Sequence, residues 1–165
     1  MNNYRYKRVY VDTSVIGGCF DSEFSLWSNS LITDFRNKRL IPLLSEIVAT
    51  EVQEAPKQVR EMYDELFFYS EFIAVNINSI ELADAYQGRK ILTPKFYEDG
   101  LHIALATIAE ADVLVSWNFK HIVHFERIRL FKKIRLFNVV NLEHGYKPLQ
   151  IFSPREVMSY GDTDD

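Results

Sequence analysis

The stretch RVYVDTSVIGG, residues 8–18, places an aspartate directly behind a run of strand-forming side chains. The letters VYV predict a buried strand over residues 8–13, and the glycine pair at 17–18 interrupts the pattern. Asp12 carries a charge that is costly to remove from water unless it is paired or bound. Its position fits two interpretations: a catalytic or ligand-binding carboxylate at the end of a strand, or an ordinary turn residue.

The length and composition of the chain are those of one globular domain. Of its 165 residues, 47% are hydrophobic and 25% are charged, so it can bury a core of its own. A net charge of -4 argues against a protein that coats nucleic acid nonspecifically, so any nucleic-acid contact must be local. We expect a single domain over residues 1–165, with its core at about 8–140.

The cysteine content and the apolar runs bear on the compartment. Cys19 is the only cysteine, which excludes an internal disulfide and favours a reducing compartment. The charged N-terminal segment lacks the apolar core of a signal peptide, and no apolar run approaches the length of a membrane span. We therefore expect a cytoplasmic protein that does not act at a membrane.

Strand-like and helix-like segments alternate along the chain. Strands are expected at residues 8–13, 40–45, 72–78, 112–118 and 137–141. Helices are expected at residues 23–37, 46–55, 56–70, 78–90, 99–111 and about 154–160, with a frayed tail at 161–165. The doubled letters IRLF within 127–140 are expected to form a loop before the last strand. This alternation predicts an α/β fold with three layers, α/β/α, and a mostly parallel central sheet of about five strands.

Capping patterns mark two of these helix starts. Asn78 is followed three residues later by Glu81, and Ser153 is followed by Pro154 and Glu156. In each pattern the first side chain can accept a hydrogen bond from the helix backbone, and the glutamate can accept one from the cap residue. We expect the two helices to begin at these residues.

Four polar side chains are expected to meet at one edge of this sheet. Asp12 and Asn118 directly follow the first and fourth strands, whose carboxyl ends share an edge in a parallel sheet. Glu51 and Asp99 stand on helices near strand ends and can approach the same crevice. Three carboxylates and an amide oxygen form an all-oxygen site that suits Mg²⁺ or Mn²⁺. The chemistry that such a site favours is metal-assisted phosphoryl transfer.

Four motifs, taken in their order along the chain, resemble those of a known family. They are VDTSV at 11–15, LSEIVATEV at 44–52, EDGLHIALA at 98–106 and ADVLVSWNFKHI at 111–122. Together they resemble the PIN-domain ribonucleases, which include the VapC toxins of bacterial toxin–antitoxin pairs. The resemblance extends over most of the chain and implies the PIN fold.

The resemblance also implies roles for five residues. Asp12, Glu51 and Asp99 would be the catalytic acids that bind the metal, and Ser116 would be a small hydroxyl residue that supports them. Asn118 departs from the family pattern, because many members place a fourth acid there. An asparagine can still offer an oxygen to the metal, but it removes one negative charge.

The reaction that the resemblance implies is hydrolysis of RNA. A water molecule activated by Mg²⁺ or Mn²⁺ would attack the phosphodiester in line and leave a 5′-phosphate and a 3′-hydroxyl. The implied role is the toxin of a type II toxin–antitoxin pair. Members of the family commonly form homodimers and are held inactive by a small antitoxin protein.

A run of basic residues beyond the fourth strand could contact the RNA backbone. Two aromatic side chains, Phe125 and Phe131, are interleaved with it, as in surfaces that bind single strands. The same run could equally be a solvated face. Its members are Lys120, Arg127, Arg129, Lys132, Lys133 and Arg135.

Two other functions compete with the ribonuclease. A PIN domain without catalytic activity could bind RNA or a protein partner, and the neutral Asn118 favours this alternative. A phosphatase of the haloacid dehalogenase type also begins with an aspartate after a strand. The segment VDTSV, however, lacks the second aspartate that such enzymes use two residues later.

Several further residues have a purely structural interpretation. Asp112 precedes the fourth strand, so we expect it to be a turn residue at the opposite end of the sheet. Glu98 should point away from the site, because it lies one residue early on its helix. The pair His121 and His124 lacks the further ligands of a structural zinc site. His102 is expected to pack beside the site helix.

Overall fold

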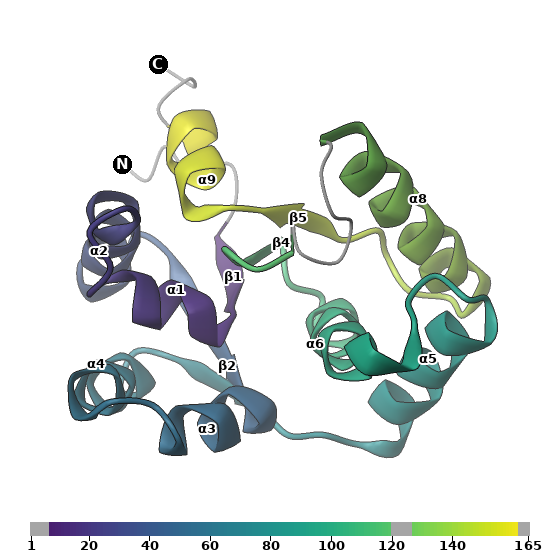
Figure 1. Cartoon of the computed structure of the whole chain (residues 1–165), viewed down its shortest axis with the longest axis horizontal. Coiled ribbons are helices and arrows are strands. Elements are labelled where there is room, and N and C mark those ends of the chain that lie inside the picture. The colour runs from purple at the N-terminus through teal and green to yellow at the C-terminus, as the bar shows by residue number, and fades with distance from the viewer. Residues whose placement is uncertain (1–6, 120–126, 162–165) are drawn as a thin grey trace.

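A five-stranded sheet lies between two groups of helices (Figure 1). The computed structural model describes residues 7–119 and 127–161. Its strands are β1 (Arg8–Val11), β2 (Ile41–Ser45), β3 (Glu71–Ile73), β4 (Val113–Val115) and β5 (Gln150–Phe152). Its helices are α1 (Thr13–Gly18), α2 (Ser25–Arg36), α3 (Glu46–Gln53), α4 (Lys57–Phe67), α5 (Ile77–Gly88), the 3-10 helix η1 (Pro94–Phe96), α6 (Tyr97–Ile108), α8 (Arg127–Glu143) and α9 (Pro154–Gly161).

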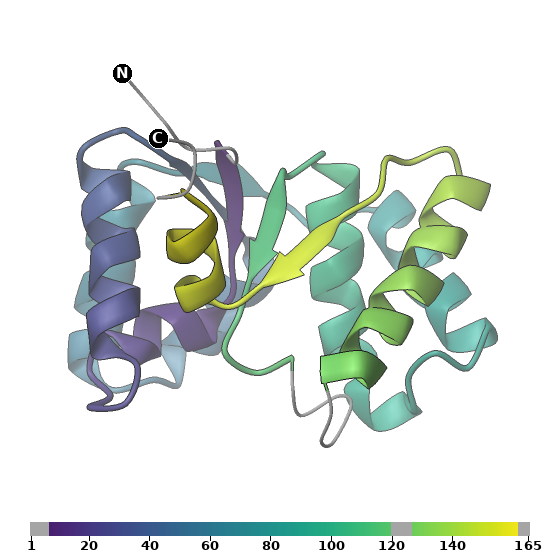
Figure 2. The ribbon, with the colours of Figure 1, turned by 90° about the horizontal axis from the view of Figure 1, so that it is seen from above.

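The strands of this sheet are all parallel and stand in the order β3-β2-β1-β4-β5. The chain moves outward from β1 first on one side and then on the other, so the boundary between β1 and β4 is the switch point of the sheet. Figure 2 shows the strands running the same way, with their carboxyl ends at one edge. The predicted three-layer α/β/α fold is confirmed.

Alternating side chains of β1 reach two separate cores. Tyr10 is level with Leu43 of β2 and Leu114 of β4, and all three belong to the core that α5, α6 and α8 cover. Val9 and Val11 belong to the core that α1, α2 and α4 cover. Successive residues of a strand face opposite sides of a sheet, so helices on both faces bury the letters VYV completely.

The predicted last strand is wrong. Residues 137–141 belong to α8, and the strand that pairs with β4 is β5. Ile134, Phe137 and Val140 recur every three residues and pack on one core, which is the spacing of a helix face. The same helix includes the doubled letters IRLF, so this segment is not a loop.

The capping pattern is confirmed at one helix start and wrong at the other. At α9, the N–H of Glu156 donates to Oγ of Ser153 at 3.2 Å, and the N–H of Ser153 donates to Oε1 of Glu156 at 3.1 Å. At α5 the cap is Asn76, whose Oδ1 accepts from the N–H of Ser79 at 2.9 Å and whose N–H donates to Oγ of Ser79 at 3.0 Å. The predicted pair at 78 and 81 therefore lies inside α5.

The glycine pair at 17–18 ends a short helix, α1, that the sequence analysis does not predict. An added Cβ at Gly18 would lie 2.6 Å from Oγ of Ser28 and 2.7 Å from Nε1 of Trp117. Gly18 is therefore needed because α2 and the segment after β4 approach α1 closely, and not because the chain must turn there.

The lengths of the helices and the C-terminal end of the described chain bear on two further expectations. No helix within residues 7–119 and 127–161 is long and apolar enough to cross a membrane. Helix α9 extends to Gly161, and the rest of the predicted frayed tail lies outside the described residues.

Candidate metal centre

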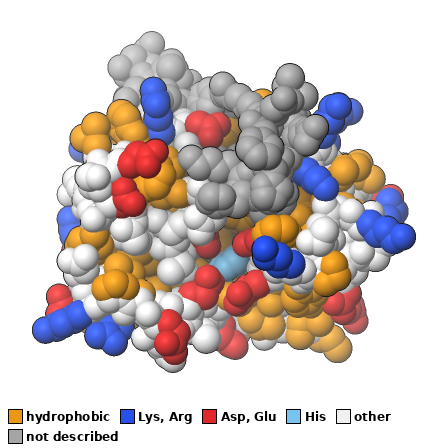
Figure 3. All heavy atoms as spheres, in the orientation of Figure 1, with side chains coloured by type: hydrophobic (Ala, Val, Ile, Leu, Met, Phe, Trp, Pro, Cys, Tyr) orange, Lys and Arg blue, Asp and Glu red, His pale blue; other side chains and the backbone are white. Residues whose placement is uncertain are grey.

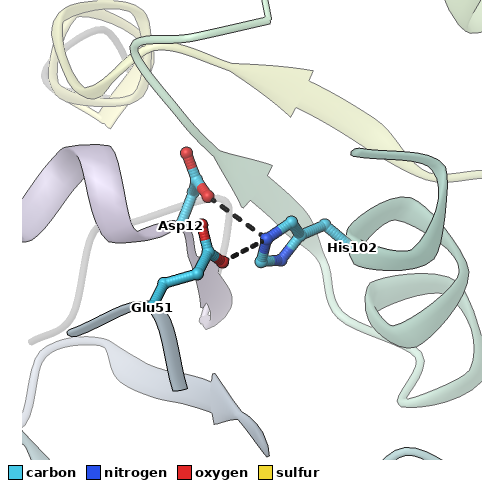
Figure 4. A group of neighbouring side chains, drawn as sticks. All are labelled: Asp12, Glu51 and His102. Atoms are coloured by element: carbon cyan, nitrogen blue, oxygen red, sulfur yellow. Dashed lines mark hydrogen bonds and ion pairs between the residues drawn. The ribbon is translucent and has the colours of Figure 1, made fainter. Parts of the chain in front are cut away.

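Three side chains from separate elements meet at the carboxyl edge of the sheet (Figure 4). Asp12 follows β1, Glu51 lies on α3 and His102 lies on α6. Nε2 of His102 is 2.8 Å from Oε1 of Glu51 and 3.7 Å from Oδ1 of Asp12. One ligand atom from each side chain lies within 4.8 Å of the other two, so the three residues could hold a metal ion. They are termed the Asp12–Glu51–His102 cluster below.

Two hydroxyl groups hold Asp12 in one orientation. Its Oδ2 accepts hydrogen bonds from Oγ of Ser14 at 2.7 Å and from Oγ of Ser116 at 2.8 Å. Ser14 in turn accepts from the N–H of Trp117, and Ser116 accepts from the N–H of Asn118, both at 2.9 Å. These bonds join the start of α1 to the segment after β4. They leave Oδ1 facing the other members of the cluster.

A chain of hydroxyl groups holds His102 from its other side. Its Nδ1 lies 2.7 Å from Oη of Tyr10, and this Oη lies 2.7 Å from Oγ of Ser45. Ser45 is also the N-cap of α3, because its Oγ accepts from the N–H of Val48 at 3.3 Å. Helix α3 carries Glu51, so one serine hydroxyl helps to position two members of the cluster.

The cluster concentrates charge in a buried place. Asp12 and His102 are only 6% and 2% exposed, so water screens their charges poorly. Burial by itself would lower the pKa of His102. The hydrogen bond to Glu51 and the charges of Asp12, Glu51 and Asp99 outweigh burial and raise this pKa above its ordinary value. Burial also raises the pKa of Tyr10, so the phenol keeps its proton.

Asp99 lies beside the cluster and not within it. It stands in the first turn of α6, three residues before His102, and is half-buried. Burial raises the pKa of its carboxyl group; His102 acts against this shift, and the charges of Asp12 and Glu51 add to it. Asp99 therefore interacts electrostatically with the cluster, although its carboxylate is not among the ligand atoms that lie within 4.8 Å of one another.

Asn118 is at the surface of the molecule. Its side chain is exposed, and its backbone N–H donates to Ser116. Of the four predicted metal ligands, the structure thus brings Asp12 and Glu51 into one cluster, places Asp99 next to it, and leaves Asn118 at the surface.

The sequence analysis does not predict His102 as a member of the site. His102 was expected to pack beside the site helix, but it lies on α6 itself and points at Asp12 and Glu51. A weak signal for it exists, because residues three apart share one face of a helix and Asp99 lies three residues before His102. A lone histidine at such a spacing is too common in helices to be informative.

The other acidic candidates lie where a structural role predicts. Oδ2 of Asp112 accepts from the N–H of Lys7 at 3.1 Å and from the N–H of Arg8 at 2.8 Å, at the amino edge of the sheet. This confirms that Asp112 lies at the opposite end of the sheet, as expected. Glu98, the neighbour of Asp99, is exposed.

The predicted basic surface falls only partly on described residues. Lys132 and Arg135 are exposed on α8, whereas Nζ of Lys133 donates to the carbonyl oxygen of Ile91. Contact of this surface with RNA stays a prediction. Outside the described part of the chain lie Lys120, His121, His124, Phe125 and the side chains of Arg127 and Arg129.

The face of the molecule that carries the cluster is rich in acidic groups. In the orientation of Figure 1, Figure 3 shows carboxylate side chains gathered around a histidine near the middle of this face. Lysine and arginine side chains lie beside this group and farther out. A local excess of carboxylates raises the concentration of cations near the surface.

Comparisons with known proteins bear on the fold. No protein-family model matches the sequence, and a comparison with curated proteins gives no match. Among solved structures, one match is a chain in the crystal structure of VapBC2 from Rickettsia felis bound to a DNA fragment from their promoter. The TM-score is 0.51 at 19% sequence identity, and the match covers 70% of this chain and 92% of that chain. This likeness shows that the two chains share a fold.

Proposed function

We propose that this chain is a PIN-domain ribonuclease, the toxin of a type II toxin–antitoxin pair, which hydrolyses RNA phosphodiester bonds with a divalent metal ion. The proposal rests on the convergence of Asp12, Glu51 and His102 at the carboxyl edge of the sheet, next to the switch point. Parallel α/β sheets bind their ligands at this place. The fold shared with a chain of VapBC2 supports the proposal.

The residues of the cluster fit a divalent cation. Asp12 is buried, its Oδ2 is bound by two hydroxyl groups, and its Oδ1 lies close to the carboxylate of Glu51. Carboxylates held so close repel each other or take up a proton unless positive charge lies between them. Carboxylate oxygens suit Mg²⁺ or Mn²⁺, the ions proposed here. A bound ion would activate the attacking water and stabilise the leaving oxygen.

The chain's own residues would hold and orient the reacting groups. Asp12 and Glu51 would bind the ion, and Ser14 and Ser116 keep the Asp12 carboxylate in place through their hydrogen bonds. Asp99 lies beside the cluster, where its carboxylate can complete the ion's surroundings or accept a proton from water. The neutral side chain of Asn118 would contribute an oxygen from the exposed rim.

The partners follow from the same proposal. The exposed cations Lys132 and Arg135 on α8 would contact phosphates of the RNA. The fold shared with a chain of a VapBC complex favours a small antitoxin protein as the inhibitor. We further propose that the chain is a single cytoplasmic domain that forms a homodimer.

The direct test is cleavage of an end-labelled RNA by the purified chain with Mg²⁺, with Mn²⁺ and with EDTA. We expect cleavage to require an ion, to leave 5′-phosphates, and to be lost in Asp12→Asn and Asp99→Asn. Glu98→Gln is the matched control, because it removes an exposed charge one residue from Asp99. Cleavage that survives both aspartate substitutions would contradict the site.

A binding module without catalytic activity is the second candidate, and Asn118 is the observation that favours it. Its side chain is neutral and exposed at the position where many PIN domains have a fourth acid. Under this alternative, the chain binds RNA with no cleavage in any metal, and Asn118→Asp creates activity. Cleavage by the unmodified chain would exclude it.

A further inference from the structure

We propose that His102 binds the metal ion directly through Nε2, which makes the centre a mixed nitrogen and oxygen site that prefers Mn²⁺ to Mg²⁺. This inference rests on the proposed function in one respect, namely that a divalent ion binds at Asp12 and Glu51. It differs from the all-oxygen site that the sequence predicts. The added ligand determines which ion binds best.

The distances within the cluster are those of three ligands around one ion. Donor atoms bound to the same ion at about 2.1 Å are about 3.0 Å apart at a right angle and about 4.2 Å apart on opposite sides. Nε2 of His102 lies 2.8 Å from Oε1 of Glu51 and 3.7 Å from Oδ1 of Asp12. Both distances are close to those expected for pairs of ligands on one ion, and the two carboxylate ligand atoms lie within 4.8 Å of each other.

The hydrogen bonds of Tyr10 favour the form of His102 that can bind a metal. The phenol O–H donates to Oγ of Ser45 at 2.7 Å, so its oxygen can accept the Nδ1–H of His102, which lies 2.7 Å away. With the proton of the neutral ring on Nδ1, Nε2 is free to bind an ion. The ion would take the place of the Nε2 proton that the hydrogen bond to Glu51 requires when no ion is bound. Metal-binding histidines commonly donate their second ring N–H to a partner in this way.

The negative charge around His102 exceeds the single positive charge that a proton on its imidazole would supply. The carboxylates of Asp12 and Glu51 lie 3.7 Å and 2.8 Å from Nε2 of His102, and one positive charge on the ring would balance only one of them. Asp12 and His102 are almost completely buried, so solvent screens the charge at this side of the group poorly. A dication bound to Nε2 and the two carboxylates would supply the second positive charge at the centre of the group.

The nitrogen ligand sets the preference among ions. Mg²⁺ binds oxygen ligands in near-octahedral geometry and keeps several waters. Divalent ions of the first transition series accept imidazole as well as carboxylate, and Mn²⁺ accepts both while keeping the open positions that a reacting phosphate needs. Because one of the three protein ligands is a nitrogen, the cluster favours Mn²⁺ over Mg²⁺.

The test measures metal binding and not activity. The full chain is loaded with Mn²⁺, and electron spin echo envelope modulation is recorded to detect the coupling of the ion to ¹⁴N. Calorimetric titrations give Kd for Mn²⁺ and for Mg²⁺. The variants are His102→Gln and, as the matched control, His144→Gln, which changes an exposed histidine after α8.

We expect ¹⁴N coupling in the unmodified chain and in His144→Gln, and none in His102→Gln. The ratio of the Mg²⁺ Kd to the Mn²⁺ Kd should fall by about tenfold or more in His102→Gln, since even residues that only orient a ligand are worth 10–100-fold in affinity. Mn²⁺ bound without ¹⁴N coupling would overturn the proposal, and so would an absence of Mn²⁺ binding.

A second variant covers the case in which His102→Gln does not fold. Tyr10→Phe keeps the buried ring but removes the hydroxyl that positions His102. We expect it to keep the ¹⁴N coupling and to bind Mn²⁺ about tenfold more weakly, with little change for Mg²⁺. An equal loss of affinity for Mn²⁺ and for Mg²⁺ would overturn the assignment of the Mn²⁺ preference to His102.

The outcomes separate this inference from the proposed function. Mn²⁺-dependent RNA cleavage without ¹⁴N coupling would leave the ribonuclease standing and overturn the role of His102 as a ligand. Coupling to ¹⁴N without cleavage of any RNA would confirm the ligand and contradict the ribonuclease.

Discussion

Both edges of the sheet carry an aspartate at a strand end, but the two side chains have different surroundings. Asp112, before β4, is exposed and accepts from two backbone N–H groups at the start of β1. Asp12, after β1, is buried, and its Oδ1 faces Glu51 and His102. A carboxylate bound by backbone donors stabilises the fold. A carboxylate that is buried next to another carboxylate lowers the stability of the fold. Such groups are found at functional sites.

The largest expected effect follows from Asp12→Asn. The amide is a neutral and weaker metal ligand, so metal-dependent RNA cleavage should fall by roughly a thousandfold, which corresponds to several kcal/mol of lost transition-state stabilisation. Single-turnover cleavage in Mn²⁺ measures this. Thermal unfolding in EDTA should show little change in stability, because the loss of like-charge repulsion with Glu51 offsets the weaker hydrogen bonds from Ser14 and Ser116. A destabilised variant would mean that Asp12 is structural, like Asp112.

Asp112→Ala should give the opposite result. Two exposed backbone N–H groups exchange their acceptor for water, so the free energy of unfolding should fall by about 1 kcal/mol, measured by urea denaturation. Cleavage by the folded fraction should be unchanged, because Asp112 lies at the far edge of the sheet. Reduced cleavage at unchanged stability would remove the distinction between the two aspartates.

The variant Ser116→Ala tests whether hydroxyl donors position the Asp12 carboxylate. The variant removes one of two hydroxyl donors to Oδ2, and a hydrogen bond to a charged group is worth about 1.5–3 kcal/mol. We expect cleavage to fall about tenfold or somewhat more, measured at saturating metal. Ser30→Ala is the control, because Ser30 donates to the carbonyl oxygen of Leu26 within its own helix, α2. Equal effects of the two variants would argue against a positioning role.

The smallest expected effect concerns the cations. The double substitution Lys132→Glu and Arg135→Glu should weaken RNA binding several-fold and reduce its salt dependence by roughly 0.7 in slope per lost contact. Lys147→Glu is the matched control, because Lys147 is an exposed cation 3.9 Å from Glu110, near the amino edge. Fluorescence anisotropy over a range of salt concentrations measures both. Unchanged affinity in the double variant would identify a solvated face.

Most of the fold could be predicted because it rests on local patterns. The strand formers before Asp12 and the helices between strands required βαβ connections, and these require a parallel sheet whose carboxyl ends share an edge. The segment 137–141 could not be predicted, because its two valines suit a strand as well as a helix. Its assignment depended on Phe137 and Val140 facing a core built by α5 and α6.

The sequence by itself determined that Asp12 stands at the carboxyl edge of a parallel sheet, because strand propensity and burial pattern are local properties. It also indicated Glu51 and Asp99 as candidates for the same crevice. Only the tertiary structure decided that Nε2 of His102 approaches both Asp12 and Glu51 while Asp99 stays outside this cluster. The reason is physical: the orientation of His102 is set by Tyr10 of β1, and through Tyr10 by the cap of α3, segments that meet only when the sheet and helices have packed.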